Sequence, residues 1–258
     1  MNERFVTLSG VQVHLMESGD GEPLLYLHGA GSAGQWGPFL ESLSRRYRVI
    51  APTHPGFGKS ERPEWLDRVD DVVVMYMDLL DQLGLERTFL MGHSVGGWIA
   101  ASLATLASHR IRRLVLANSA GLKPPGVKLP DLFAMTEAET AFLMTADKAE
   151  AEKRAAHKPS VEELEAQLHN RAALARLAWN PYLHDPKLPH RLHRAGMPAL
   201  LVWGKDDGLF STKVAEHWLE QLPNARLELI DKAGHNPMRE QGEQVTKVVL
   251  DFLAEGAR

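Results

Sequence analysis

Short, continuous apolar runs recur along the chain, and longer segments with helical periodicity separate them. The runs are Leu24–Leu27, Val49–Ala51, Phe89–Met91, Leu114–Ala117, Ala199–Trp203 and Leu227–Ile230. Runs without alternating polar positions are typical of strands that are buried on both faces of a mostly parallel sheet. Two further runs, Phe5–Leu8 and Val11–Leu15, flank Ser9-Gly10 and predict a hairpin at the edge of that sheet.

The segments between these runs predict helices. Asp70–Leu83 repeats apolar residues at close to every 3.6 positions and ends at Gly84. The other predicted helices are Val95–Ala107, Val214–Leu222 and Val245–Leu253. Strands that alternate with helices indicate the α/β class, with helices on both faces of a mostly parallel sheet.

Residues 122–190 interrupt this alternation, because they contain no strand-like run. Thr136 with Glu139, and Ser160 with Glu163, match the capping box that begins many helices. A structureless loop of this length is uncommon in a compact domain, so we expect a helical insertion. The predicted domains are a core of residues 1–121 and 191–258 and an insertion of residues 122–190.

The composition narrows the classes of function. The 258 residues fit one large domain with an insertion, and the absence of cysteine excludes disulfides, thiolate catalysis and cysteine metal sites. A formal net charge of −4 gives no electrostatic reason to expect a nucleic acid or an anionic membrane as a partner. No apolar run approaches the roughly 20 residues of a membrane-spanning helix. The N-terminus lacks the apolar core of a signal peptide, so we expect a cytoplasmic protein.

Gly92-His93-Ser94-Val95-Gly96 lies between a predicted strand and a predicted helix. In that context a G-x-S-x-G sequence forms a sharp turn that raises the serine hydroxyl above the sheet, and its glycines allow the backbone to bend tightly. Ser94 is therefore the candidate nucleophile. A serine hydroxyl needs a base that takes its proton and a third group that orients the base.

Candidate partners for Ser94 follow two later strands. Asp206 and Asp207 come shortly after one predicted strand, and His235 comes shortly after the next. Loops that follow parallel strands gather at one edge of the sheet, so an acid and a base are expected there. Their order along the chain is serine, acid, histidine, and the spacing alone leaves both aspartates open.

On these residues, the chain resembles the α/β-hydrolase superfamily over essentially its whole length. The family's acid is the third residue after a strand-ending glycine, which selects Asp207 after Gly204, and its base follows a glycine, as His235 does. The resemblance therefore implies a catalytic triad of Ser94, Asp207 and His235. It also implies the α/β-hydrolase fold, with a helical cap formed by residues 122–190.

His28-Gly29-Ala30-Gly31 resembles the family's H-G-x-G loop. The resemblance implies an oxyanion hole formed by the backbone N–H groups of Ala30 and Val95. Val95 also begins the helix after the nucleophile, where the partial positive charge of the helix terminus favours an anion. Thr53–Ser60 resembles the family's D-x-P-G-x-G-x-S loop, and we interpret His54 within it as structural.

Caps in this family supply much of the substrate pocket, so aromatic residues in and near the insertion are candidates for substrate binding. They are Trp36, Phe133, Phe142, Trp179 and Tyr182. Packing in the core of the cap is the alternative role for the residues of the insertion. His184, Asp185, His190 and His193 lack the i, i+4 spacing of a helical zinc motif, so we expect neither a metal nor a cofactor.

The favoured function is a serine carboxylesterase that acts on a small molecule through an acyl-enzyme. A carbon–carbon bond hydrolase of the meta-cleavage product type is an alternative, because its cap length and triad spacing are similar. That subfamily usually has Trp after the catalytic His, where this chain has Asn236, and H-G-x-G-P-G, where this chain has Gly31-Ser32-Ala33-Gly34. Lactonases and perhydrolases share the same triad, and some members of the superfamily are ligand receptors. Nothing in the sequence marks an oligomer interface.

Overall fold

The computed structural model describes residues 1–256, and its strands form one eight-stranded sheet in the order β1-β2-β4-β3-β5-β6-β7-β8. The strands are β1 Asn2–Leu8, β2 Val11–Ser18, β3 Glu22–Leu27, β4 Tyr47–Pro52, β5 Thr88–His93, β6 Ile111–Ala117, β7 Ala199–Gly204 and β8 Ala225–Ile230. β2 pairs antiparallel with both β1 and β4, and the pairs from β4 to β8 are parallel. Every apolar run that predicted a strand lies in one, and the N-terminal hairpin is confirmed at the sheet edge.

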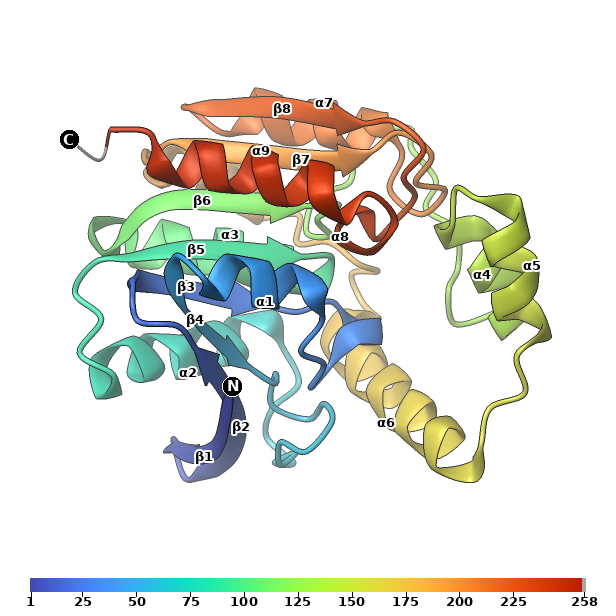
Figure 1. The fold of residues 1–258 in the computed structure, drawn as a ribbon, viewed down its shortest axis with the longest axis horizontal. Helices are drawn as coiled ribbons and strands as arrows, with labels where there is room; N and C mark the ends of the chain where they lie inside the picture. Colours follow the sequence, from blue (N-terminus) through green and yellow to red (C-terminus); the bar gives the residue numbers. More distant parts are fainter. Residues whose placement is uncertain (257–258) are drawn as a thin grey trace.

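Helices cover both faces of the sheet, as predicted (Figure 1). They are α1 Pro38–Ser44, α2 Val69–Gln82, α3 Val95–Leu106, α7 Thr212–Gln221, α8 Pro237–Glu240 and α9 Gly242–Ala254. The short 3₁₀ helices are η1 Ala30–Ser32, η2 Ser108–Arg110, η3 Leu188–His190 and η4 Leu192–Arg194. The sequence did not predict α1, because this seven-residue helix is too short to show a clear period.

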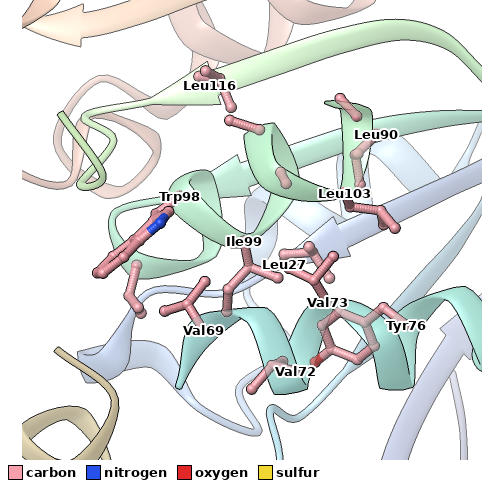
Figure 2. Close-up of a cluster of buried hydrophobic side chains, with 14 of the residues drawn as sticks. Leu27, Val69, Val72, Val73, Tyr76, Leu90, Trp98, Ile99, Leu103 and Leu116 are labelled. Carbon is pink, nitrogen blue, oxygen red and sulfur yellow. The ribbon is translucent and has the colours of Figure 1, made fainter. Parts of the chain in front are cut away.

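The sheet separates two apolar cores. On one face, side chains of α2 and α3 pack against the sheet, including Val72, Tyr76 and Ile99, as Figure 2 shows. On the other face, α1 and α9 cover the sheet, and Val249 and Phe252 of α9 are buried there. These two cores fix the strands whose C-terminal ends carry the candidate site.

Three α-helices lie between β6 and β7, beyond the C-terminal ends of the parallel strands (Figure 1). They are α4 Glu137–Met144, α5 Lys148–Ala156 and α6 Val161–Ala178. Both predicted capping boxes are present, since Thr136 accepts from the Glu139 N–H and Ser160 accepts from the Glu163 N–H. The sequence did not predict α5, which begins at an aspartate cap, Asp147, and carries few apolar residues. Across residues 1–256, no helix has the length and apolar character required to cross a bilayer.

Candidate active site

Ser94 occupies a strained turn between β5 and α3. Its backbone has φ +54° and ψ −121°, a conformation that residues other than glycine rarely adopt. The turn is tied to the end of β6, because the Ser94 N–H donates to the Ala117 carbonyl at 3.0 Å and the Ala120 N–H donates to the Ser94 carbonyl at 3.0 Å. A Cβ on Gly96 would lie 2.2 Å from the Leu27 carbonyl oxygen, so only glycine allows this close approach.

The structure brings Ser94, His235 and Asp207 into one line of hydrogen bonds. His235 Nε2 lies 3.0 Å from Ser94 Oγ, and His235 Nδ1 lies 2.9 Å from Asp207 Oδ2. Since a carboxylate can only accept, Nδ1 carries the proton and Nε2 is free to accept the serine hydroxyl proton. This geometry suits a nucleophile, a general base and an orienting acid.

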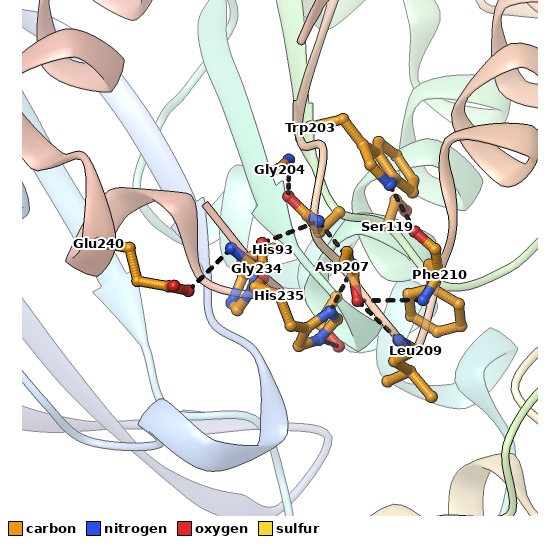
Figure 3. Close-up of polar contacts among 12 residues, drawn as sticks. His93, Ser119, Trp203, Gly204, Asp207, Leu209, Phe210, Gly234, His235 and Glu240 are labelled. Atoms are coloured by element: carbon orange, nitrogen blue, oxygen red, sulfur yellow. Dashed lines mark hydrogen bonds and ion pairs between the residues drawn. The ribbon is translucent and has the colours of Figure 1, made fainter. Parts of the chain in front are cut away.

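Asp207, rather than Asp206, faces the histidine. The second oxygen of Asp207, Oδ1, accepts from the N–H groups of Leu209 at 2.8 Å and Phe210 at 3.1 Å, as Figure 3 shows. Trp203 Nε1 donates to the Phe210 carbonyl at 2.7 Å and fixes the same turn. Asp206 is exposed. The carboxylate of Asp207 is therefore held in one orientation by backbone donors before any substrate arrives.

Asn118, directly after β6, also contacts Asp207, and the sequence analysis missed it. Its Nδ2 donates to Asp207 Oδ2 at 2.6 Å, and its Oδ1 accepts from the Gly204 N–H at 3.2 Å. Asn118 is fully buried and has φ +41°, which asparagine tolerates better than most residues. Its place after a parallel strand, at the edge where the other site residues gather, was the signal that could have revealed it.

The end of α4 holds the loops that carry the acid and the base. The Gly208 N–H donates to the Leu143 carbonyl at 3.1 Å, and the His235 N–H donates to the Met144 carbonyl at 2.9 Å. Both carbonyls belong to the last turn of α4, where they have no partner within the helix. The backbone of the segment between β6 and β7 is therefore part of the scaffold of the site.

Glu240, at the end of α8, strengthens the same connection. Its carboxylate accepts from the Gly234 N–H at 3.1 Å and from the Ala146 N–H at 2.8 Å. Figure 3 shows its contact with Gly234, the residue before His235. One side chain thus joins the histidine loop to the turn between α4 and α5.

The backbone groups predicted for the oxyanion hole flank Ser94. Val95 is the first residue of α3, so its N–H has no partner within the helix and lies at the positive end of the helix dipole. Ala30 follows Gly29, which lies against the nucleophile: a Cβ on Gly29 would be 3.2 Å from Ser94 Cβ and 2.6 Å from His93 Nδ1. The Val95 N–H is next to the nucleophile in the chain, and the role of the Ala30 N–H as the second donor stays a prediction.

His93 holds the backbone of the candidate base, His235. Its Nε2 lies 2.8 Å from the His235 carbonyl oxygen, to which it donates. Burial lowers the pKa of His93 to about 3, and the nearby charge of His235 acts in the same direction. His93 is therefore neutral and holds the backbone of His235 without competing for the proton.

Three of the predicted substrate-binding residues form one aromatic cluster. The ring of Phe133 lies 5.1 Å from that of Trp179 and 5.9 Å from that of Tyr182, measured between centroids. The Tyr182 hydroxyl accepts from the Leu132 N–H at 2.7 Å and donates to the Pro130 carbonyl at 2.8 Å, so it anchors the chain before α4. Substrate contact by this cluster stays a prediction.

The other two predicted substrate-binding residues do not join this cluster. Phe142 is 52% exposed and lines a surface hollow between α5 and α8, which Asp206 and Lys232 also line. Trp36 precedes α1, where its indole N–H donates to Glu41 at 3.0 Å, and it packs against the core under α1 and α9. The aromatic character that made Phe142 and Trp36 candidates does not account for where the structure places them.

The histidine-rich stretch before β7 is held by ordinary contacts. His184 Nδ1 lies 2.9 Å from the Tyr182 carbonyl oxygen, and Asp185 pairs with Arg191. Within residues 1–256, no group of three or more His, Cys, Asp or Glu side chains is arranged to hold a metal ion.

Comparison with known proteins places this geometry in a family. The family model described as the α/β-hydrolase fold matches residues 22–240. The chain is 30% identical to the 2-hydroxymuconate semialdehyde hydrolase of Pseudomonas sp. strain CF600, over 98% of this chain and 94% of that protein. It is 28% identical to the 2-hydroxy-6-oxo-2,4-heptadienoate hydrolase of Pseudomonas putida strain F1, over 97% of this chain and 96% of that protein.

Among solved structures, a serine hydrolase involved in carbazole degradation is 27% identical and superposes with a TM-score of 0.76, covering 98% of each chain. The chain therefore belongs to the α/β-hydrolase fold family and is a serine hydrolase.

Proposed function

We propose that the protein hydrolyses a carbon–carbon bond beside the 6-oxo group of a 2-hydroxy-6-oxo-2,4-dienoate. The observation that carries this proposal is the similarity, over almost the entire length of both chains, to hydrolases named for such compounds. The sequence alone favoured an ester as substrate, with carbon–carbon cleavage as the alternative. The relatives support the alternative better.

The site offers the groups that this reaction needs. We propose that His235 takes the proton of Ser94 as Oγ adds to the C6 carbonyl carbon, and that the N–H groups of Ala30 and Val95 stabilise the resulting oxyanion. Asp207 orients His235 and stabilises its protonated form. Two contacts support the roles of His235 and Asp207: 3.0 Å from His235 to Ser94 and 2.9 Å from His235 to Asp207.

The leaving group must accept an electron pair on carbon. In the 2,6-dioxo tautomer, the proton of the 2-hydroxyl has moved to C5, so the pair from the broken C5–C6 bond spreads to the C2 oxygen. The products are a 2-hydroxypenta-2,4-dienoate, which takes the proton from His235, and an acyl group on Ser94. Water activated by His235 then releases the acyl group as a carboxylic acid, so one water is consumed and no redox partner is needed.

We further propose that residues 122–190 act as a cap over this site. The contacts that support a cap are those of α4 with both catalytic loops and the aromatic cluster of Phe133, Trp179 and Tyr182. A cap of this kind excludes water while the C5–C6 bond breaks and admits it for the second step.

Ester hydrolysis is the second candidate, and the residue after His235 favours it. Asn236 stands where meta-cleavage hydrolases usually have Trp, and its side chain accepts from the Arg239 N–H at 3.2 Å as the cap of α8. An ester needs only the triad and the oxyanion donors, without a dienolate leaving group. Lactone hydrolysis and perhydrolysis would use the same groups.

The ratio of kcat/KM for the two substrate classes decides between the candidates. We expect kcat/KM for 2-hydroxy-6-oxo-2,4-heptadienoate to exceed that for p-nitrophenyl acetate by at least about tenfold, which corresponds to ~1.4 kcal/mol of transition-state stabilisation. Both substrates deliver an acetyl group to Ser94, so the comparison isolates the leaving group. A ratio below one would favour the esterase. Tight binding of the dienoate without turnover would favour a ligand receptor.

A further inference from the structure

Behind the candidate oxyanion loop, the buried side chains of Tyr76, His54 and His28 are linked by hydrogen bonds that pass through backbone groups of the two histidines. The Tyr76 hydroxyl, on α2, lies 2.6 Å from His54 Nδ1. His54 Nε2 lies 2.8 Å from the His28 carbonyl oxygen, and the His54 N–H donates to His28 Nε2 at 2.8 Å. His28 Nδ1 in turn lies 2.9 Å from the Gly29 carbonyl oxygen. The chain of contacts ends on the peptide that precedes Ala30.

Only one placement of protons satisfies all of these contacts. His28 Nε2 accepts from a backbone N–H, so the proton of this neutral ring is on Nδ1 and is donated to the Gly29 carbonyl. His54 Nε2 faces a carbonyl oxygen and must donate, so His54 Nδ1 carries no proton and accepts from the Tyr76 hydroxyl. The His28 carbonyl and the Tyr76 hydroxyl therefore favour the same tautomer of His54, with its proton on Nε2.

The Gly29 carbonyl oxygen accepts several hydrogen bonds at the end of this series of contacts. Besides His28 Nδ1, it accepts from the Ser32 N–H at 3.0 Å and from the Ser32 hydroxyl at 3.2 Å. In a planar trans peptide the N–H points opposite to the carbonyl. Three donors on the Gly29 oxygen therefore turn the Ala30 N–H to the opposite side of this peptide.

We propose that Tyr76, His54 and His28 are positioning residues that aim the Ala30 N–H into the oxyanion hole. The proposal rests on the proposed role of Ala30 in hydrolysis. A peptide rotated by half a turn would present the Gly29 oxygen to the substrate and would repel the oxyanion instead of stabilising it. The relay of hydrogen bonds fixes the peptide in the useful orientation before substrate binds.

Burial keeps the relay in one protonation state. It lowers the pKa of His28 to about 4, and it lowers the pKa of His54 well below its ordinary value, with the neighbouring His28 acting in the same direction. Burial also raises the pKa of the Tyr76 hydroxyl well above its ordinary value. All three groups are neutral near pH 7. The rings of His28 and His54 lie 3.9 Å apart between centroids, and Phe57 packs edge-on against both.

The test is Tyr76→Phe, which removes only the hydroxyl at the start of the relay. Figure 2 shows Tyr76 among Val72 and Val73 in the core, where a phenyl ring fits the same space. We expect kcat to fall about tenfold to a hundredfold, since a misdirected oxyanion donor is lost in part, while KM changes less than about twofold. Affinity for a boronic acid that forms a tetrahedral adduct on Ser94 falls by the same factor.

Tyr26→Phe is the matched control. Tyr26 is also a buried tyrosine, but it lies on β3 in the core on the other face of the sheet. We expect its kcat to stay within about twofold of wild type. The positioning role is wrong if Tyr76→Phe and Tyr26→Phe behave alike in kcat and in boronic-acid affinity.

Two further measurements separate positioning from folding and from the identity of the substrate. Nitrogen NMR of labelled histidine reports the tautomers: we expect a proton on His54 Nε2 and on His28 Nδ1 in wild type, and a weaker preference for Nε2 at His54 in Tyr76→Phe, where only the His28 carbonyl still favours it. A wild-type His54 that carries its proton on Nδ1 overturns the proposal, whatever the stability of Tyr76→Phe. The rate at which a fluorophosphonate labels Ser94 tests the relay without any carbon–carbon substrate. If dienoates are not cleaved but the label and the tautomer respond to Tyr76→Phe, the proposed substrate is wrong and the relay stands.

Discussion

The two flanks of Ser94 are held in place by different chemistry. On the acid–base flank, Asp207 accepts from two backbone N–H groups, from Asn118 and from His235. Carbonyls of the last turn of α4 accept from the loops that carry Asp207 and His235. On the oxyanion flank, neutral imidazoles and a phenol set the direction of one peptide. Hydrogen bonds to a carboxylate hold the first flank in place. On the second flank, the orientation of the peptide depends on the tautomers of buried, uncharged rings.

Each flank also contacts a different part of the segment between β6 and β7. The acid–base flank contacts main-chain carbonyls at the end of α4. The loops after β4, near the oxyanion flank, contact side chains of α6: Asn170 accepts from the Gly58 N–H at 2.9 Å, and Arg176 donates to the Leu66 carbonyl at 2.7 Å. Figure 1 shows α4 and α5 set apart from α6, in keeping with these separate attachments. A change on one flank is therefore expected to leave the other intact.

The largest effect is expected from Asp207→Asn on the acid–base flank. An amide at this position favours the wrong tautomer of His235, and such a change costs about 10⁴-fold in kcat in other triad enzymes. The Leu209 and Phe210 N–H groups still find an oxygen acceptor, so the fold is expected to persist. Steady-state kinetics and circular dichroism check this. The control is the exposed neighbour, Asp206→Asn, and equal losses in the two variants would contradict the assignment of the acid.

A smaller loss is expected when the oxyanion flank is displaced by Gly29→Ala. The added Cβ would lie 2.6 Å from His93 Nδ1 and 3.2 Å from Ser94 Cβ, so the loop that carries the Ala30 N–H or the His93 ring behind His235 must shift. We expect kcat to fall about 10²-fold, comparable to the loss of one oxyanion donor. Gly31→Ala is the control, because a Cβ there meets nothing within 4 Å. Wild-type turnover in Gly29→Ala would show that this loop does not set the rate.

A modest effect is expected from Glu240→Gln, which weakens the connection between the acid–base flank and α4. Glutamine offers one carbonyl oxygen to the two N–H donors of Gly234 and Ala146, so one of them loses its acceptor. We expect the free energy of unfolding to fall by ~1 kcal/mol and kcat to fall about threefold. Urea unfolding and kinetics measure both. Glu243→Gln, on the exposed side of α9, is the control, and an equal change there would remove the special role of Glu240.

The smallest predicted effect near neutral pH is the pH dependence of stability that the buried histidines cause. Burial lowers the pKa of His28 to about 4 and that of His93 to about 3, whereas an ordinary histidine has 6.5. Between pH 6.5 and 4 the unfolded chain binds more protons than the folded protein, so stability falls as the pH falls through this window. Calorimetry from pH 7.5 to 4.5 is expected to show a falling Tm, with a shallower slope in His93→Gln than in wild type. A Tm that rises on acidification, or an unchanged slope in His93→Gln, would contradict the neutral state of these rings.

Much of the fold could be predicted from the sequence, because its signals are local. Apolar runs and capping boxes are read over a few residues, and the strands of the sheet and the starts of α4 and α6 follow from them. A nucleophile, an acid and a base at one edge of the sheet were predicted on the same basis, since each lies shortly after a strand, whereas the choice of Asp207 over Asp206 came from the resemblance to the α/β-hydrolase superfamily. The helix α5 was missed because it is short and its residues are mostly polar, so it shows no apolar period.

The residues that support the site could not be predicted in this way. Asn118 and Tyr76 act across elements that are far apart in the sequence, and neither lies in a recognisable motif. Tyr182 was a candidate for substrate binding or for packing in the cap, and the sequence did not predict that its hydroxyl contacts the backbone of Leu132 and Pro130, a partnership set by tertiary packing. Such contacts join residues that are far apart in the sequence, so no local sequence pattern predicts them.

The most direct test of the central claim is product analysis with 2-hydroxy-6-oxo-2,4-heptadienoate, by wild type and by Ser94→Ala. We expect wild type to release acetate and 2-hydroxypenta-2,4-dienoate in equal amounts. We expect Ser94→Ala to lose at least about 10³-fold in kcat while it still binds the dienoate. Undiminished release of both products by Ser94→Ala, or intact dienoate after prolonged incubation with wild type that hydrolyses p-nitrophenyl acetate, would contradict carbon–carbon hydrolysis through Ser94.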